Sequence, residues 1–356
     1  GNRRVKCDPP HDFESIAMQI SPFNGEPNGG FVNSYMRRHG NDGRARADDV
    51  MLYFNAETVP VYDFLSREFC ICDKWHCSLP GPTWPNRMYA MAGTSKGIKT
   101  NDLPAPPGHT FPCLFDVLSA NGVDWRYYET DIGAIRLFAN YLGDQAKVKT
   151  IDDPTDGFYV NAERGTLPAV TYIDPDFEDV PGPSANDDHP PSHVTGGQAL
   201  VARIYRALAN SPKWKSTMFV ITYDEHGGFY DHVTPGPAED DDIPHYGVRV
   251  PAFVISPFAG RGSVRNDLYD HTSIVRTALN RFCPGVAHGL GKRVEHARDL
   301  SNTLVTQDPR AAPVLQWEPS TKGGLVDLGT FDAPPTSLQE SLRELKRRRD
   351  AALLIR

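Results

Sequence analysis

The stretch that decides the fold reads TMFVITY over residues 217–223 and continues directly as DEHGG over residues 224–228. Its first part is apolar or β-branched on both faces, which is typical of a strand covered by helices on either side. Just before it, Val201, Ile204 and Leu208 have the spacing of one face of an amphipathic helix. A helix leading into a buried strand indicates an α/β fold.

Further strands are predicted elsewhere in the chain, separated by helical patterns, at residues 123–128, 169–173 and 248–256. This alternation is the order expected of βαβ units. We therefore predict a three-layer α/β/α sandwich with a largely parallel central sheet. Polar segments without periodicity predict surface loops at residues 174–194 and 235–244.

The end of the chain, residues 337–356, carries leucines near one helical face and a basic run on the other. This pattern favours a solvated helix docked on the main domain over a helix lying on a membrane surface. We divide the chain accordingly into a main domain, residues 1–330, and a C-terminal helical extension, residues 331–356.

The composition is that of a soluble globular protein. Hydrophobic residues make up 39% of the 356 residues, and 37 Lys and Arg against 45 Asp and Glu give a net charge of −8. A negative chain lacks the electrostatic footprint of a general nucleic-acid binder, so we exclude that class of partner.

No apolar run approaches the roughly 18 residues that span a bilayer. Residues 1–7 also lack the apolar core of a signal peptide. Six cysteines without a Cys-x-x-Cys pair predict no disulfide scaffold and leave the redox compartment open.

Two neighbouring carboxylates, Asp224 and Glu225, appear where the apolar strand at residues 217–223 ends. Ligands bind at the carboxyl ends of strands in open α/β sheets, and carboxylate oxygens suit a divalent cation. The plainer alternative is that both residues cap the next element. Their position at the end of a buried strand favours the metal-binding interpretation.

A second informative segment reads HCSLPGPTWPNRMY over residues 76–89. Pro85 is well placed as an early helical residue, so Thr83 lies at or just before the start of a helix that continues through Met91. The free N–H groups of a helix start attract anions such as phosphate. A hydroxyl there caps the helix, or it attacks a substrate when a base or a metal activates it. Taken alone, the pattern favours capping.

Several histidines lie in polar settings, namely His189, His193 and His271. Each is able to donate a proton to a leaving alkoxide or to hold a phosphoryl oxygen. Each also fits the role of an ordinary loop histidine, and the residues alone leave both roles open.

Together these segments resemble the phosphoesterase family that contains the non-specific phospholipases C and a group of acid phosphatases. The resemblance covers roughly residues 8–283. It is carried by GPTWPNR at residues 81–87, DDHP at 187–190, YDEHGGFYDHV at 223–233, GVRVP at 247–251 and DHTSI at 270–274. Five separated motifs in the family's order make a chance match untenable.

The resemblance implies an alkaline-phosphatase-like fold that hydrolyses phosphate esters with one divalent metal ion of unspecified identity. By position, Thr83 matches the nucleophile, which is also a metal ligand, and Asp224 and Glu225 match two further ligands. His189 and His271 match histidines of the phosphate pocket, one of which protonates the leaving group. We expect Asn86 and Arg87 to help hold the phosphate.

One family feature is absent from the sequence. Family members usually open with a segment Glu-Asn-Arg-Ser-Phe-Asp-His that completes the metal site, and no such segment occurs here. We therefore expect the chain as written to bind metal weakly and to have little activity.

The resemblance ranks the possible functions. The leading one is a phospholipase C that releases diacylglycerol and a phosphorylated headgroup through a phosphothreonine intermediate. The first alternative is a broad-specificity acid phosphatase, and the second is an inactive fragment or binding module that lacks part of the metal site. The partners implied are a phospholipid or another phosphate ester and transient contact with a membrane surface. Export from the cytoplasm is implied by the resemblance alone.

Overall fold

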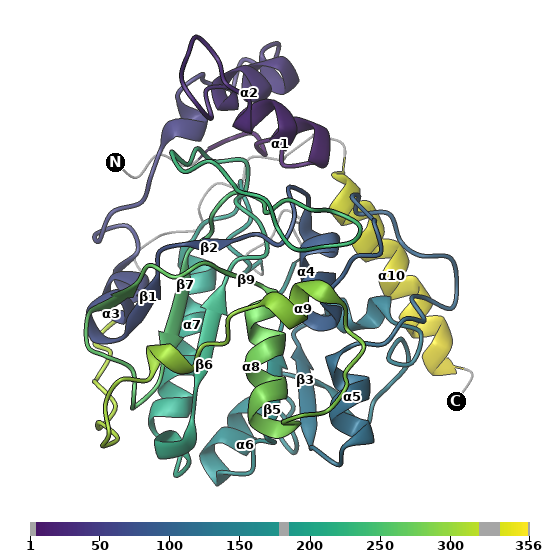
Figure 1. Cartoon of the computed structure of the whole chain (residues 1–356), viewed down its shortest axis with the longest axis vertical. Coiled ribbons are helices and arrows are strands. Elements are labelled where there is room, and N and C mark those ends of the chain that lie inside the picture. Colours follow the sequence, from purple (N-terminus) through teal and green to yellow (C-terminus); the bar gives the residue numbers. More distant parts are fainter. Residues whose placement is uncertain (1–4, 178–184, 320–334, 355–356) are drawn as a thin grey trace.

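The computed structural model describes residues 5–177, 185–319 and 335–354. It is an α/β protein whose described strands form three separate sheets, with a helical layer of α1 and α2 at the top of Figure 1. Helix α1 spans Phe13–Ile20 and helix α2 spans Phe31–His39. The α/β class predicted from the sequence is confirmed.

The largest sheet has the strand order β6-β7-β1-β8. Its members are β6 (Phe219–Thr222), β7 (Ala252–Ile255), β1 (Cys70–Cys72) and β8 (Ser263–Arg265). Strand β7 runs antiparallel to both β6 and β1, whereas β1 and β8 are parallel, so this sheet is mixed. The strand predicted at residues 217–223 is β6, although its side chains are only partly buried.

A second sheet has the order β4-β3-β5 and is entirely parallel. It consists of β4 (Val148–Thr150), β3 (Trp125–Glu129) and β5 (Val170–Ile173). Two of the predicted strands, at residues 123–128 and 169–173, therefore correspond to β3 and β5. The third sheet is the short parallel pair of β2 (Trp75–His76) and β9 (Tyr269–Asp270).

Side chains alternate along β3 and show the layers of the fold. Trp125 and Tyr127 pack in one apolar cluster with Phe115 of α5 (Leu114–Ala120). Tyr128 points to the opposite face, where it packs with Phe158 of α6 (Phe158–Arg164) and with α7 (Thr195–Ala209). Because successive side chains of a strand point to opposite faces, helices cover this sheet on both sides. The α/β/α layering is therefore present around β3.

The remaining elements connect these layers. They are α3 (Pro60–Glu68), α4 (Thr83–Ala92), α8 (Thr272–Phe282), α9 (Lys292–His296), η1 (Asp49–Met51), η2 (Ala134–Leu137), η3 (Trp214–Ser216) and η4 (Ser301–Thr303). All six cysteines are buried and none forms a disulfide. Among the described helices, none has both the length and the apolar character needed to cross a bilayer.

The C-terminal helix α10 (Ser337–Leu354) lies along the right-hand edge of the molecule in Figure 1. Its leucines Leu338, Leu342 and Leu345 are buried in the same apolar cluster as Trp84 of α4. Trp84 also donates a hydrogen bond from Nε1 to Oγ of Ser341 at 2.7 Å. The helix expected at this end of the chain is thus docked against α4, while the domain boundary predicted at residue 330 lies outside the described residues.

Candidate active site

The turn after β6 carries the two carboxylates singled out in the sequence. Gly227 and Gly228 follow them with φ angles of 62° and 72°, a backbone region that disfavours other residues. The Gly227 N–H donates a hydrogen bond to Oε2 of Glu225 at 2.6 Å, which fixes the buried Glu225 side chain inside the turn. A side chain at Gly228 would collide with Pro9, because its Cβ would lie 2.7 Å from Pro9 Cβ. The glycine pair therefore lets the segment around Pro9 lie directly against the turn.

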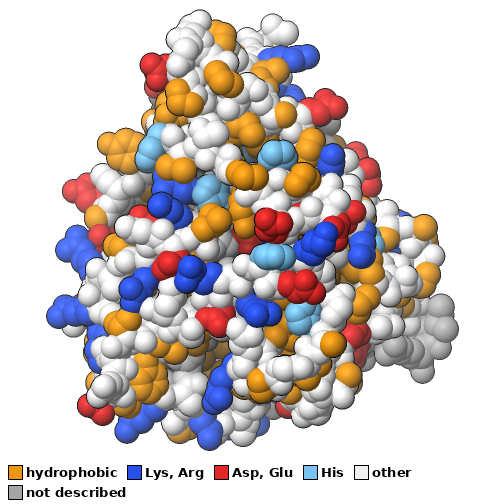
Figure 2. All heavy atoms as spheres, in the orientation of Figure 1, with side chains coloured by type: hydrophobic (Ala, Val, Ile, Leu, Met, Phe, Trp, Pro, Cys, Tyr) orange, Lys and Arg blue, Asp and Glu red, His pale blue; other side chains and the backbone are white. Residues whose placement is uncertain are grey.

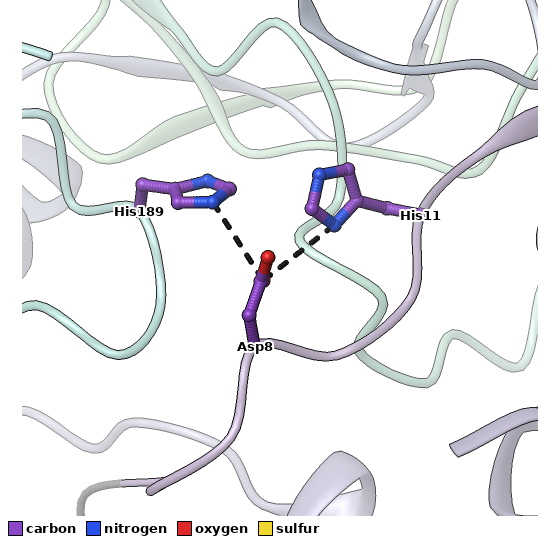
Figure 3. A group of neighbouring side chains, drawn as sticks. All are labelled: Asp8, His11 and His189. Carbon is purple, nitrogen blue, oxygen red and sulfur yellow. Dashed lines mark ion pairs between the residues drawn. The ribbon is translucent and has the colours of Figure 1, made fainter. Parts of the chain in front are cut away.

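That N-terminal segment brings Asp8 and His11 beside His189, as Figure 3 shows. Oδ1 of Asp8 lies 3.6 Å from Nε2 of His189 and 3.8 Å from Nδ1 of His11. The ring of His11 is edge-on to the ring of His189, with centroids 5.2 Å apart. Two segments that are remote in sequence thus meet at one point.

Electrostatics link this cluster to the turn. Burial lowers the pKa of His11, but the carboxylates of Glu225 and Asp8 outweigh burial, so the pKa of the imidazole is raised. Burial raises the pKa of Asp8, but the imidazoles of His189 and His11 outweigh it, so this pKa is lowered. Burial is the main cause of the raised pKa of Glu225, and Asp224 adds to it. Asp8, His11, His189 and Glu225 therefore interact as one charged site.

The cluster fits a divalent cation by its ligand types. The ligand atoms of Asp8, His11 and His189 all lie within 4.8 Å of one another. Oδ1 of Asp8 is buried, and no described group donates a hydrogen bond to it. Nδ1 of His11, the ring nitrogen that faces Asp8, is hydrogen-bonded to the Pro9 carbonyl at 2.8 Å. Together with Glu225, this donor set suits a metal of the zinc or iron type.

Helix α4 places Thr83 in its first turn, as the sequence predicted. Asn86 is buried and donates hydrogen bonds from Nδ2 to the carbonyls of Gly81 and Pro82 at 2.8 and 3.2 Å, and so shapes the loop that leads into the helix. Thr83 itself is buried. Among the described residues no hydrogen bond joins it directly to Asp224 or Glu225. The substrate contact predicted for Asn86 remains a prediction, since its partners here belong to the protein.

Arg87, one turn after Thr83, connects α4 to the carboxylates. Its Nε donates to Oδ2 of Asp224 at 2.9 Å, and its Nη1 donates to Oδ1 of Asp174 at 2.7 Å. Asp174 follows β5 and also accepts hydrogen bonds from the Tyr127 hydroxyl and the Ala134 N–H. Arg87 therefore ties the ends of β5 and β6 to the same helix. The phosphate contact predicted for Arg87 remains a prediction beside this observed role.

His271 lies behind the turn. Its Nε2 donates to the Asp224 carbonyl at 2.7 Å, and its Nδ1 accepts a hydrogen bond from Trp75 Nε1 at 3.2 Å. Burial lowers its pKa, which favours the neutral ring that this pair of hydrogen bonds requires. His271 thus supports the backbone of Asp224, and the catalytic role predicted for it stays a prediction.

Asp188, the neighbour of His189, connects that histidine to the same turn. Its Oδ2 accepts hydrogen bonds from the hydroxyls of Tyr62 and Tyr223 at 2.6 and 2.8 Å, and Tyr223 directly precedes Asp224. Burial raises the pKa of Asp188 to about 6. The two tyrosine hydroxyls therefore hold the His189 segment against the end of β6.

Sequence reasoning missed Asp8, His11, Asp174 and Asp188. The first two stand in the short polar run DPPHD at residues 8–12, where an Asp and a His flank two prolines before a helix. That run was a signal for a fixed, non-helical segment with two metal-binding side chains. Asp174 and Asp188 act through hydrogen bonds that no local pattern reveals.

The fold and the site together define a class of protein. Its members are α/β proteins with carboxylates at the end of a strand, imidazoles beside them and a hydroxyl in the first turn of a linked helix. More particularly, the chain belongs to the phosphoesterase family, whose model matches residues 1–283. The sequence-based recognition of that family is confirmed.

Several named phospholipases C are similar to this chain in sequence. Non-specific phospholipase C6 from Arabidopsis thaliana is 36% identical over 305 residues, which cover 78% of this chain and 57% of that protein. Non-specific phospholipase C1 from the same plant is 35% identical over 302 residues, covering 78% of this chain and 56% of that protein. Phospholipase C A of Mycobacterium tuberculosis (strain ATCC 25618 / H37Rv) is 27% identical, covering 65% of this chain and 52% of that protein. The chain thus spans little more than half the length of these relatives.

Solved structures are more distant. A protein in the alkaline phosphatase superfamily from Vibrio parahaemolyticus aligns with a TM-score of 0.44 and 12% identity, covering 69% of this chain and 66% of that chain.

Proposed function

We propose that the chain carries the catalytic site of a phospholipase C, which hydrolyses a phospholipid to diacylglycerol and a phosphorylated headgroup. The observation that carries this proposal is the meeting of Asp8, His11 and His189 beside Glu225, at the turn to which Arg87 ties helix α4. The identity with non-specific phospholipases C supports it, since those relatives match most of this chain.

A divalent cation belongs to the proposal. Asp224 and Glu225 would hold it, with Thr83 as the third ligand, and Asp8 with its two histidines offers further donors beside Glu225. When bound, such an ion supplies positive charge to a phosphoryl group and lowers the pKa of a ligating hydroxyl.

The chain's own residues perform the remaining steps. The Thr83 N–H at the start of α4 holds a phosphoryl oxygen, because the Trp84 N–H already donates to Oδ1 of Asn101 and Pro85 has no N–H. Oγ1 of Thr83 gives its proton to solvent water and attacks phosphorus, and the bond from phosphorus to the glycerol oxygen breaks. A protonated imidazole of the cluster donates its proton to that departing oxygen.

Water completes the turnover. Its oxygen bonds to phosphorus while the bond from phosphorus to Thr83 Oγ1 breaks, and Oγ1 takes up one proton of that water. The same imidazole, now neutral, takes the other proton of the water. His11 suits this role because the carboxylates of Glu225 and Asp8 raise the pKa of its imidazole.

The test compares substrates. We expect hydrolysis by this chain to be slow and to require added divalent metal, with phosphatidylcholine hydrolysed faster than a simple aryl phosphate and diacylglycerol and phosphocholine as products. Faster hydrolysis of the aryl phosphate would identify a monoester phosphatase instead. No hydrolysis of either substrate, with stoichiometric metal bound, would mean a binding module.

A further inference from the structure

Five large apolar side chains are exposed on the N-terminal helical layer and on the turn that follows the candidate site. Tyr53 is 86% exposed and Phe54 is 52% exposed, and both follow η1 directly. The whole set, here called the rim patch, consists of Phe23, Met51, Tyr53, Phe54 and Tyr230. Figure 2 shows hydrophobic side chains gathered over the upper part of that face, over the layer of α1 and α2. Soluble proteins rarely expose such groups together unless something binds there.

Specific contacts join the three segments that carry the rim patch. The Tyr230 N–H donates to the carbonyl of Val50, next to Met51, at 2.9 Å. The Tyr230 ring packs edge-on against Phe31, with centroids 5.4 Å apart. Asn28 of the turn that follows Phe23 donates from Nδ2 to the Asp231 carbonyl at 2.9 Å. The three segments that carry the rim patch, residues 23–31, 50–54 and 230–231, are therefore held together by direct contacts.

The same contacts lead from the rim patch to the candidate active site. Phe31 also packs edge-on against His226, with centroids 6.0 Å apart, and His226 directly follows Glu225. Nε2 of His226 is hydrogen-bonded to Gln19 of α1 at 3.0 Å. The segments that carry the patch thus contact the turn of the candidate site, whose proposed substrate is a lipid.

The side chains of the rim patch and the charges around it favour one kind of binding partner. Tyr and Phe side chains favour the boundary between lipid chains and water. Two arginines near the patch are paired, Arg44 with Asp42 and Arg46 with Asp48, and the whole chain carries a net charge of −8. These charges favour a zwitterionic surface over an anionic one.

We infer that the rim patch is the surface by which this protein sits on a zwitterionic phospholipid layer, an inference that rests on the proposed phospholipase function. Insertion of Tyr53 and Phe54 holds the molecule with its active-site turn at the lipid headgroups. Binding is driven by burial of apolar surface, so salt weakens it little.

Sedimentation of the protein with phosphatidylcholine vesicles tests the inference without requiring hydrolysis. The double variant Tyr53→Ser/Phe54→Ser is compared with a matched control, Val305→Ser/Val314→Ser, which removes two apolar side chains that are 51% and 78% exposed outside the rim patch. We expect the vesicle affinity of the patch variant to fall by about tenfold or more. The control should bind like the unchanged protein. Equal affinities of the two variants, or a larger loss in the control, would overturn the inference.

Two further measurements test the assignment of the rim patch independently of the proposed function. Hydrolysis of p-nitrophenylphosphocholine, which is dissolved and needs no lipid surface, should be unchanged in the patch variant while its hydrolysis of vesicles falls. Protein that binds vesicles but hydrolyses neither substrate would contradict the function and leave the patch assignment standing. Binding that requires phosphatidylserine, or that disappears in high salt, would overturn the patch assignment. Loss of self-association in the patch variant without loss of vesicle binding would identify a second copy as the partner and overturn it as well.

Discussion

Arg87 and Asp224 are joined by a hydrogen bond of 2.9 Å between Nε and Oδ2, and Arg87 lies one turn after Thr83 on the same helix. This contact connects the hydroxyl-bearing helix α4 to the carboxylate turn after β6. Asp174 shares the guanidinium through Nη1, so one cation serves two carboxylates. The position of α4 relative to the turn therefore depends on Arg87.

Removing this cation should destabilise the protein strongly. Arg87→Met leaves the carboxylates of buried Asp174 and half-buried Asp224 without their cation, and we expect a loss of about 3 kcal/mol in the free energy of unfolding. Arg87→Lys keeps the charge but cannot donate in the same fork, so we expect a smaller loss in stability together with reduced hydrolysis. Urea unfolding and initial rates measure the two effects.

An exposed ion pair provides the matched control. Arg203 binds Asp152 at 2.7 Å with both side chains more than half exposed. Arg203→Met should therefore cost less than about 1 kcal/mol. A loss for Arg87→Met no greater than that of the control would show that the buried bridge does not hold α4 in place.

The hydroxyl of Thr83 should be indispensable for hydrolysis. We expect Thr83→Ala to lower the rate by on the order of 10³-fold or more, because it removes the attacking oxygen, while Thr83→Ser keeps a measurable rate. Circular dichroism should show that both variants are folded. A rate for Thr83→Ala close to that of the unchanged protein would exclude Thr83 as the nucleophile.

Asp188 should make stability depend on pH in a defined window. Burial raises its pKa in the folded chain from 3.8 to about 6. Between these values the folded chain binds a proton that the unfolded chain has lost, so this carboxyl reduces stability as pH rises through the window. Asp188→Asn cannot titrate, yet its side-chain oxygen still accepts from Tyr62 or Tyr223. Its stability relative to the unchanged protein should therefore increase from about pH 4 to about pH 6 by at most ~3 kcal/mol.

The control for this prediction is an exposed carboxyl. Asp308→Asn, at a solvent-exposed position, should show no such change relative to the unchanged protein. Urea unfolding of all three proteins across the window measures the differences. A difference for Asp188→Asn that is flat with pH, or that falls as pH rises, would show that Asp188 is ionised normally in the folded protein.

The C-terminal helix should contribute to the core behind α4. Leu342 of α10 is 5% exposed, whereas Leu354 near the end of the same helix is 89% exposed. We expect Leu342→Ala to lower the free energy of unfolding by about 2–5 kcal/mol and Leu354→Ala to change it by less than about 0.5 kcal/mol. Thermal unfolding of the pair checks this. Similar small effects would mean that α10 is not part of the cooperative core.

Local patterns were enough to predict much of the fold. The apolar run at residues 217–223 predicted β6, and the helical spacing of Val201, Ile204 and Leu208 predicted α7. The direction of β7 was not predictable in this way, because hydrophobic alternation carries no information about whether neighbouring strands run parallel. The sheet that contains β6 is mixed because β7 runs antiparallel to both of its neighbours, while β4, β3 and β5 are parallel as expected.

The candidate site was predicted only in part. Asp224, Glu225 and Thr83 stand in conspicuous local settings, at a strand end and at a helix start. Asp8 and His11 reach the site through packing of a distant segment against Gly228, and such long-range contacts leave no periodic trace in one sequence. Arg87 was singled out from the sequence, but its contacts with Asp174 and Asp224 were not predictable, because these two residues follow different strands.

The central claim is that the Thr83 oxygen becomes bonded to phosphorus during turnover. Rapid acid quenching of the protein with excess phosphatidylcholine, followed by peptide mass spectrometry, tests this most directly. We predict a phosphocholine adduct on Thr83 in the peptide that contains residues 83–87, and its absence in Thr83→Ala. An adduct on another residue, or rapid turnover with Thr83 unmodified at every quench time, would contradict the account.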